Sequence, residues 1–135
     1  MRIVVDCNVV IAAGLTNGTC RAVLQWVLQN HTLILSEEIA QEYACVIKRE
    51  KFRPYWPYLQ ELTLSLCQIG FLVNSTVSPY SLSDKEDEKY LAAAEIGQAS
   101  MLITGNKKHF PEDFYGSIKI MTPTNVFQEF LMSEN

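Results

Sequence analysis

The sequence predicts an α/β fold with a central, mostly parallel sheet of about five strands flanked by helices. Short apolar segments rich in Val, Ile, Leu and Phe alternate along the chain with longer segments of helical periodicity. The first strand is apolar almost throughout, which is typical of a strand covered on both faces of a parallel sheet. The expected strands are residues 2–5, 33–35, 70–74, 101–104 and 118–121.

Helices are expected between these strands. Their apolar residues recur at spacings of three and four, so each helix presents one apolar face to the sheet. Thr19 and Ser36 are candidate N-caps, and Pro123 suits the first position of the last helix. The expected helices are residues 19–29, 37–50, 57–69 and 85–96, and a final helix that follows Thr122.

Composition is typical of a globular protein. The chain has 135 residues, of which 48% are hydrophobic and 19% charged, so we expect a single domain over residues 1–135. No apolar stretch reaches the length of a membrane span, and the first residues lack the pattern of a signal peptide, so we expect a cytoplasmic protein. The net charge of −4 argues against a broad basic nucleic-acid face, but it allows a nuclease with an acidic metal site.

The cysteines carry no recognisable motif. Cys7, Cys20, Cys45 and Cys67 form neither a CxxC pair nor a Cys/His spacing typical of zinc. We expect reduced thiols, with Cys45 and Cys67 packed as small apolar residues on helix faces.

Asp6 directly follows the first strand. Ligands in open α/β sheets bind outside the carboxyl ends of the strands, which is where Asp6 is expected to lie. An acid at this place can equally cap the segment that follows. The segment alone supports both interpretations.

Glu42 lies within the helix expected over residues 37–50, between Ile39 and Val46 of its apolar face. It is too far from the helix N-terminus to be explained by the helix dipole. It is therefore either a functional acid or a partly buried acid paired with a basic residue such as Arg49.

The segment Asp84–Glu88 holds four acids in five residues and first suggests a solvated helix start. Asp84 fits an N-cap, with Asp87 in the place of a capping-box acid. Asp87 also heads the stripe Asp87, Leu91 and Ala94, which is expected to face the sheet. Asp87 should therefore point toward the carboxyl edge of the sheet.

Thr104 and Asn106 follow another apolar strand and would lie beside Asp6 if the two strands are neighbours. A simple Gly-Asn turn is the alternative. Three converging carboxylates repel one another unless a cation joins them, and oxygen ligands without organised Cys or His favour Mg²⁺ or Mn²⁺. Such a site can activate water and clamp a phosphodiester.

At this point the chain resembles the PIN-domain proteins, close to the VapC-like ribonuclease toxins of type II toxin–antitoxin systems. The resemblance covers roughly residues 2–130. The order and spacing of four segments together make it specific. These segments are residues 3–11 with Asp6 and Asn8, residues 35–43 with Ser36 and Glu42, residues 84–91, and residues 102–111.

The resemblance implies a three-layer PIN-like fold and Mg²⁺- or Mn²⁺-dependent hydrolysis of RNA. It carries over Asp6, Glu42 and Asp87 as metal ligands, which together with Asn106 form the expected catalytic set. It also implies supporting roles for Asn8, Ser36, Asp84 and Thr104. Many PIN domains have Asp where this chain has Asn106, and an amide adds no negative charge, so a second metal and full activity are in question.

Lys107 and Lys108 are the expected substrate-binding residues, because they follow Asn106 directly. A second basic group, residues 48–53, is better explained as a helix C-terminus that complements its dipole. Members of the family commonly form homodimers and are held by an antitoxin protein, so both partners are expected here.

Two further interpretations stay open. Asn106 favours a PIN-like module that binds RNA or protein with weak or no catalysis. A phosphotransferase of the haloacid-dehalogenase type would use Asp6 as nucleophile, but it usually needs an acid two residues later, where this chain has Asn8.

Overall fold

A computed structural model describes residues 1–75 and 77–132 of the chain. In this part of the chain a six-stranded sheet is flanked by helices, which confirms the predicted fold class. The strands are β1 (Arg2–Val5), β2 (Thr32–Leu35), β3 (Phe71–Leu72), β4 (Met101–Ile103), β5 (Phe114–Tyr115) and β6 (Ile118–Met121). The helices are α1 (Cys7–Leu15), α2 (Thr19–Asn30), α3 (Glu37–Val46), α4 (Trp56–Ile69), α5 (Glu88–Ile96) and α6 (Pro123–Val126).

The strand order is β3-β2-β1-β4-β6-β5. Strand β1 pairs in parallel with both β2 and β4, with Ile3 opposite Leu33 and Met101. The pairs β2–β3 and β4–β6 are also parallel, and only β5 runs antiparallel among the described strands. The carboxyl ends of β1, β2 and β4 therefore meet at one edge, where Asp6, Ser36 and Thr104 follow them.

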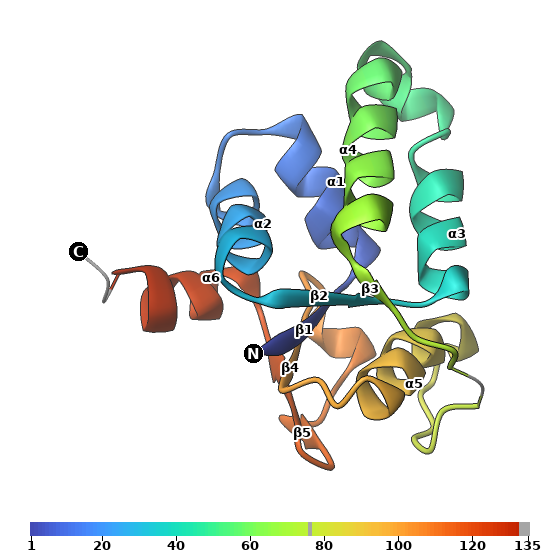
Figure 1. Cartoon of the computed structure of the whole chain (residues 1–135), viewed down its shortest axis with the longest axis vertical. Helices are drawn as coiled ribbons and strands as arrows, with labels where there is room; N and C mark the ends of the chain where they lie inside the picture. The colour runs from blue at the N-terminus through green and yellow to red at the C-terminus, as the bar shows by residue number, and fades with distance from the viewer. Residues whose placement is uncertain (76, 133–135) are drawn as a thin grey trace.

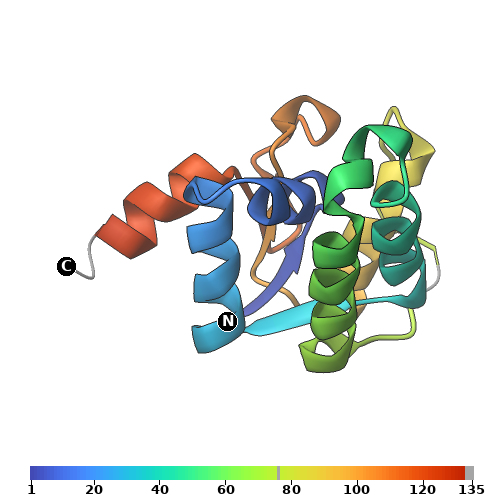
Figure 2. The ribbon, with the colours of Figure 1, turned by 90° about the horizontal axis from the view of Figure 1, so that it is seen from above.

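Helices cover both faces of the sheet. Figure 1 shows α1, α3 and α4 on one side and α5 on the other, and Figure 2 shows α6 beside α2 at the end of the molecule away from α3 and α4. Strand β1 is completely buried from Ile3 to Val5, because both faces are covered. Within the part of the chain that the structure describes, no helix is long and apolar enough to cross a membrane.

Two elements are absent from the sequence prediction. Helix α1 is buried around most of its circumference, so its apolar residues do not form the single stripe that identifies a surface helix. Strand β5 has only two residues, too few to show an alternating pattern.

Several predicted boundaries are wrong by a turn or less. Helix α3 ends at Val46 and is followed by a turn and a 3₁₀ segment (Glu50–Tyr55), in which Pro54 disfavours regular α-helix. The helix predicted over residues 85–96 begins as a 3₁₀ turn (Lys85–Asp87) before α5. Gly18, not Thr19, is the N-cap of α2, whereas Ser36 caps α3 as predicted, its Oγ accepting a hydrogen bond from the Ile39 N–H at 3.2 Å.

Candidate active site

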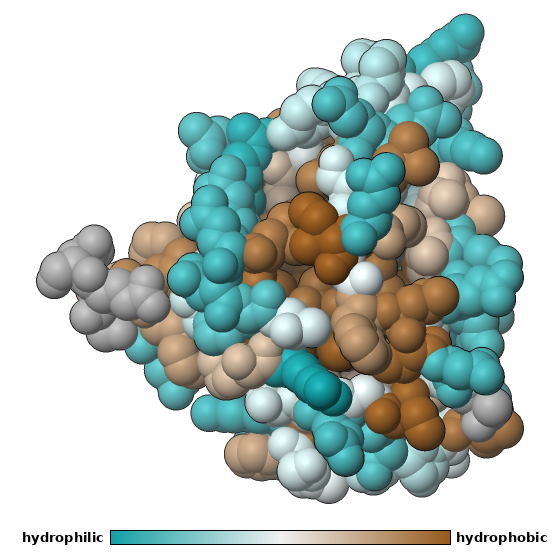
Figure 3. Space-filling view, viewed as in Figure 1, coloured by the Kyte–Doolittle hydropathy of each residue, from teal (hydrophilic) through white to brown (hydrophobic). Residues whose placement is uncertain are grey.

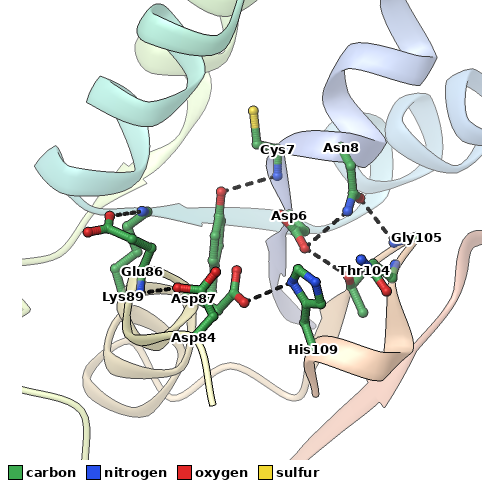
Figure 4. Close-up of polar contacts among 12 residues, drawn as sticks. Asp6, Cys7, Asn8, Asp84, Glu86, Asp87, Lys89, Thr104, Gly105 and His109 are labelled. Atoms are coloured by element: carbon green, nitrogen blue, oxygen red, sulfur yellow. Dashed lines mark hydrogen bonds and ion pairs between the residues drawn. The ribbon is translucent and has the colours of Figure 1, made fainter. Parts of the chain in front are cut away.

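Asp6 is the buried acid at the centre of the carboxyl edge. This residue is only 6% exposed although it lies directly after β1. It occupies the N-cap position of α1 but makes no side-chain capping hydrogen bond there, so helix capping does not account for its carboxylate. Instead Oδ2 accepts hydrogen bonds from the Thr104 hydroxyl at 2.8 Å and from Asn8 Nδ2 at 3.4 Å (Figure 4).

The contacts of Asn8 and Thr104 tie the β4 loop to Asp6. Asn8 Oδ1 accepts a hydrogen bond from the Gly105 N–H at 3.0 Å, and Thr104 Oγ1 accepts one from the Asn106 N–H at 3.1 Å. A Cβ atom at position 105 would lie 3.2 Å from Asn8 Oδ1, so glycine allows this close approach. The loop that carries Asn106 is therefore held against the Asp6 side of the edge.

Glu42 comes from α3 and is 25% exposed at its side chain. Oε2 forms an ion pair with Lys89 Nζ at 2.6 Å, and Oε1 accepts a hydrogen bond from the Tyr90 hydroxyl. The basic partner is thus Lys89 of α5, not Arg49 as the sequence alternative suggests. Burial alone would lower the pKa of Lys89, but hydrogen bonds and negative charges from Glu42 and Glu86 outweigh it and raise that pKa.

Asp87 lies at the start of α5, and its side chain is 15% exposed. Figure 4 shows it facing His109, whose Nδ1 is 2.9 Å from Oδ2, an ion pair when the imidazole is protonated. Among the described residues this buried oxygen has no hydrogen-bond partner of good geometry. Asp87 therefore keeps an oxygen at the site that the protein satisfies poorly.

The charges of the predicted ligands interact in two pairs, Glu42 with Asp6 and Asp6 with Asp87. Burial is the main cause that raises the pKa of Asp6, and the charge of Glu42 raises it further. Burial also raises the pKa of Asp87, with a further contribution from Asp6, against an opposing effect of His109. An all-oxygen donor set with mutual repulsion and a poorly satisfied buried oxygen fits a hard divalent cation.

A second acidic group lies beside these ligands. Asp84, Asp87 and His109 each offer a donor atom, and these atoms lie within 4.8 Å of one another. Asp84 also caps the 3₁₀ turn, because Oδ1 accepts a hydrogen bond from the Glu86 N–H at 2.9 Å. Asp6 and Glu42 are not part of this tighter group, so the two arrangements share only Asp87.

The remaining predicted site residues differ in the hydrogen bonds and ion pairs that they form. Ser36 caps α3 through its hydroxyl, which favours a structural role. Lys107 is held by Asp113 at 3.0 Å, whereas Lys108 is exposed and makes no hydrogen bond or ion pair among residues 1–75 and 77–132. Of the two predicted substrate contacts, Lys108 is the one left free within this part of the chain.

Sequence reasoning missed the roles of three neighbours of the acids: Lys89, Tyr90 and His109. Tyr90 follows Asp87 by one helical turn, which is the signal that would have placed it on the same face. The partners of Lys89 and His109 lie on other elements, and no local pattern reveals them.

The cysteines correct one expectation and allow a direct test. Cys45 and Cys67 are exposed, and Cys7 is the buried thiol. Burial raises the pKa of Cys7 to about 12, so it holds almost no thiolate at pH 8.

We expect iodoacetamide to modify Cys45 in the folded protein and Cys7 only after denaturation, as followed by peptide mass spectrometry. Equal rates for the two in the folded protein would contradict the described packing of α1.

The fold and site define an α/β protein whose parallel strands and flanking helices bring carboxylates to one edge of the sheet. A family model of the PIN domain matches residues 2–108, and the chain therefore belongs to the PIN-domain family. A chain in the crystal structure of VapBC2 from Rickettsia felis, bound to a DNA fragment from their promoter, has a similar fold with a TM-score of 0.56 and 17% identity. The match covers 90% of this chain and 98% of that one. A search of the curated proteins found no significant match.

Proposed function

We propose that this protein is a metal-dependent endoribonuclease and the toxin of a toxin–antitoxin pair. The observation that carries the proposal is the meeting of Asp6, Glu42 and Asp87 at one edge of a PIN fold. Burial and the charge of Glu42 raise the pKa of Asp6, and burial and the charge of Asp6 raise the pKa of Asp87. PIN domains are generally nucleases, and oxygen-only ligands favour Mg²⁺ or Mn²⁺. We treat residues 1–135 as one such domain.

In this proposal each residue has a defined task. Asp6, Glu42 and Asp87 hold the cation, while Asn8 and Thr104 fix the orientation of Asp6. A bound Mg²⁺ or Mn²⁺ would supply an activated water and stabilise charge on the phosphate. Asn106, held near Asp6 through the Thr104 hydroxyl, offers an amide for hydrogen bonding to water or substrate.

The test of this function is cleavage of a fluorescently labelled single-stranded RNA. We expect cleavage with Mn²⁺ or Mg²⁺, no cleavage with EDTA, and much slower cleavage of DNA with the same sequence. Binding of RNA without cleavage at millimolar Mn²⁺ would favour the alternative, a PIN-like binding module, which Asn106 in place of an acid supports.

We expect Lys108 to contact the RNA backbone. The Lys108→Ala variant should raise the KM for RNA several-fold with little change in kcat, and it should lower the salt dependence of binding by about one counterion. Lys48→Ala is the matched control, because Lys48 is also an exposed lysine but lies after α3. Equal effects of the two substitutions would show that Lys108 contributes only net charge.

Partners are part of the proposal. The structural neighbour is described as a VapBC complex, and this chain exposes large apolar side chains on α4 and β3. They are Leu64, Ile69, Phe71 and Leu72. Figure 3 shows apolar surface gathered over this region, which suits a cognate antitoxin protein or a second copy in a homodimer. We place the protein in the cytoplasm on the same proposal.

A further inference from the structure

Tyr90 connects the proposed metal ligand Glu42 to the residue that follows Asp6. It is fully buried in α5, one helical turn after Asp87. Its hydroxyl accepts a hydrogen bond from the main-chain N–H of Cys7 at 3.2 Å. A tyrosine hydroxyl has a single proton, and here that proton is donated to Glu42 Oε1.

The hydrogen bond with Cys7 holds the Tyr90 hydroxyl against the residue that directly follows Asp6 in the chain. Cys7 is the first residue of α1, so its N–H has no acceptor within the helix. Tyr90 satisfies this N–H and thereby fixes its own hydroxyl relative to the turn that follows Asp6. The position of the Glu42 carboxylate is then set relative to Asp6 through one side chain.

Glu42 needs such a support. Glu42 and Asp6 are linked through a single side chain at the same edge of the sheet, and two carboxylates this near repel each other when both are ionised. The other oxygen of Glu42 is drawn toward Lys89 at 2.6 Å. Without the Tyr90 hydroxyl, repulsion and the Lys89 ion pair would both favour movement of the carboxylate away from Asp6.

We propose that Tyr90 is a positioning residue that holds Glu42 in place for cation binding next to Asp6. This inference rests on the proposed metal-dependent function and adds a residue to it. Tyr90 touches neither substrate nor metal; it acts through Glu42. Loss of its hydroxyl should therefore lower the metal affinity in addition to any loss of stability.

Tyr43 provides a matched control. It is also a fully buried tyrosine beside the same turn, and its hydroxyl donates to the main-chain oxygen of Val5. That acceptor is a main-chain group and not a carboxylate of the proposed site. Removal of the Tyr43 hydroxyl should therefore lower the stability of the protein, as removal of the Tyr90 hydroxyl does. It should not change the position of Glu42.

The experiment titrates Mn²⁺, added as the chloride, into the full chain by isothermal calorimetry, with thermal melting of each variant. We expect Tyr90→Phe to raise the dissociation constant of Mn²⁺ at least about tenfold, because groups that orient metal ligands have effects of this size. The Mn²⁺ concentration for half-maximal RNA cleavage should rise by the same factor. Tyr43→Phe should lower the melting temperature and leave the Mn²⁺ dissociation constant unchanged.

A double-mutant cycle shows whether Tyr90 acts through Glu42. In a Glu42→Ala background, Tyr90→Phe should cause no further loss of Mn²⁺ affinity. If the two substitutions reduce the Mn²⁺ affinity independently, so that their effects multiply in the double variant, the inference is overturned. It is also overturned if Tyr90→Phe binds Mn²⁺ as tightly as the wild type, or if Tyr43→Phe loses as much Mn²⁺ affinity as Tyr90→Phe. If the wild type binds Mn²⁺ but does not cleave RNA, the proposed function is contradicted. The role of Tyr90 is still decided in that case, because it is measured by the Mn²⁺ affinities of the variants.

Discussion

The Asp6→Asn variant is expected to lose RNA cleavage by at least about 100-fold while keeping its fold, because loss of a direct ligand should exceed the effect of losing an orienting group. The amide keeps an oxygen that can accept the Thr104 hydrogen bond but removes the charge that would hold the cation. Cleavage of labelled RNA at saturating Mn²⁺ measures the first effect. Thermal melting measures the second.

Stability is the informative control for this variant. Burial raises the pKa of Asp6, so the folded protein stabilises the ionised carboxylate less than the unfolded chain does. The stabilising contribution of such a group is present at low pH and is lost as the pH rises through its raised pKa. At pH 7 the Asp6→Asn variant, whose amide is neutral, should therefore melt at or above the temperature of the wild type. Unchanged cleavage would contradict the role of Asp6.

The Glu42→Gln variant should lose both activity and stability. The amide keeps an acceptor for Tyr90 but removes the closer of the two counter-ions of Lys89, whose side chain is only 10% exposed, and leaves Glu86 at 3.5 Å. Loss of the closer partner of a mostly buried charge costs about 1–3 kcal/mol. Urea unfolding measures this loss, and Mn²⁺-dependent RNA cleavage should fall by at least about tenfold.

Glu38→Gln is the matched control for Glu42→Gln, because Glu38 is an exposed acid of the same helix. It should leave the cleavage rate unchanged and lower the free energy of unfolding by less than about 1 kcal/mol, because Glu38 lies in the first turn of α3, where the helix dipole favours an acid. If Glu42→Gln is as active and as stable as Glu38→Gln, Glu42 is only a surface acid and the proposed site is wrong.

Much of the fold could be predicted because its signals are local. The apolar run before Asp6 predicts a covered parallel strand, and the structure buries Ile3, Val4 and Val5 completely. Ser36 predicts a helix start because its hydroxyl caps the very next turn. Helix α1 could not be predicted in the same way, since burial on nearly all sides removes its periodicity.

The contacts of the candidate site could likewise be predicted only where local sequence signals place them. Asp6 and Thr104 could be placed together because parallel strands deliver their carboxyl ends to one edge, and the structure joins them by a hydrogen bond of 2.8 Å. The partners of Glu42 and Asp87 could not be predicted, because Lys89, Tyr90 and His109 meet them across different elements. These contacts depend on side-chain packing rather than on spacing along the chain.

The position of a bound cation tests the central claim most directly. Crystals of the protein soaked with Mn²⁺ allow the ion to be located by its anomalous scattering. We predict a peak coordinated by oxygens of Asp6, Glu42 and Asp87. A peak held instead by Asp84, Asp87 and His109, without Asp6 and Glu42, would contradict the proposed metal site, and so would the absence of any peak at this edge of the sheet.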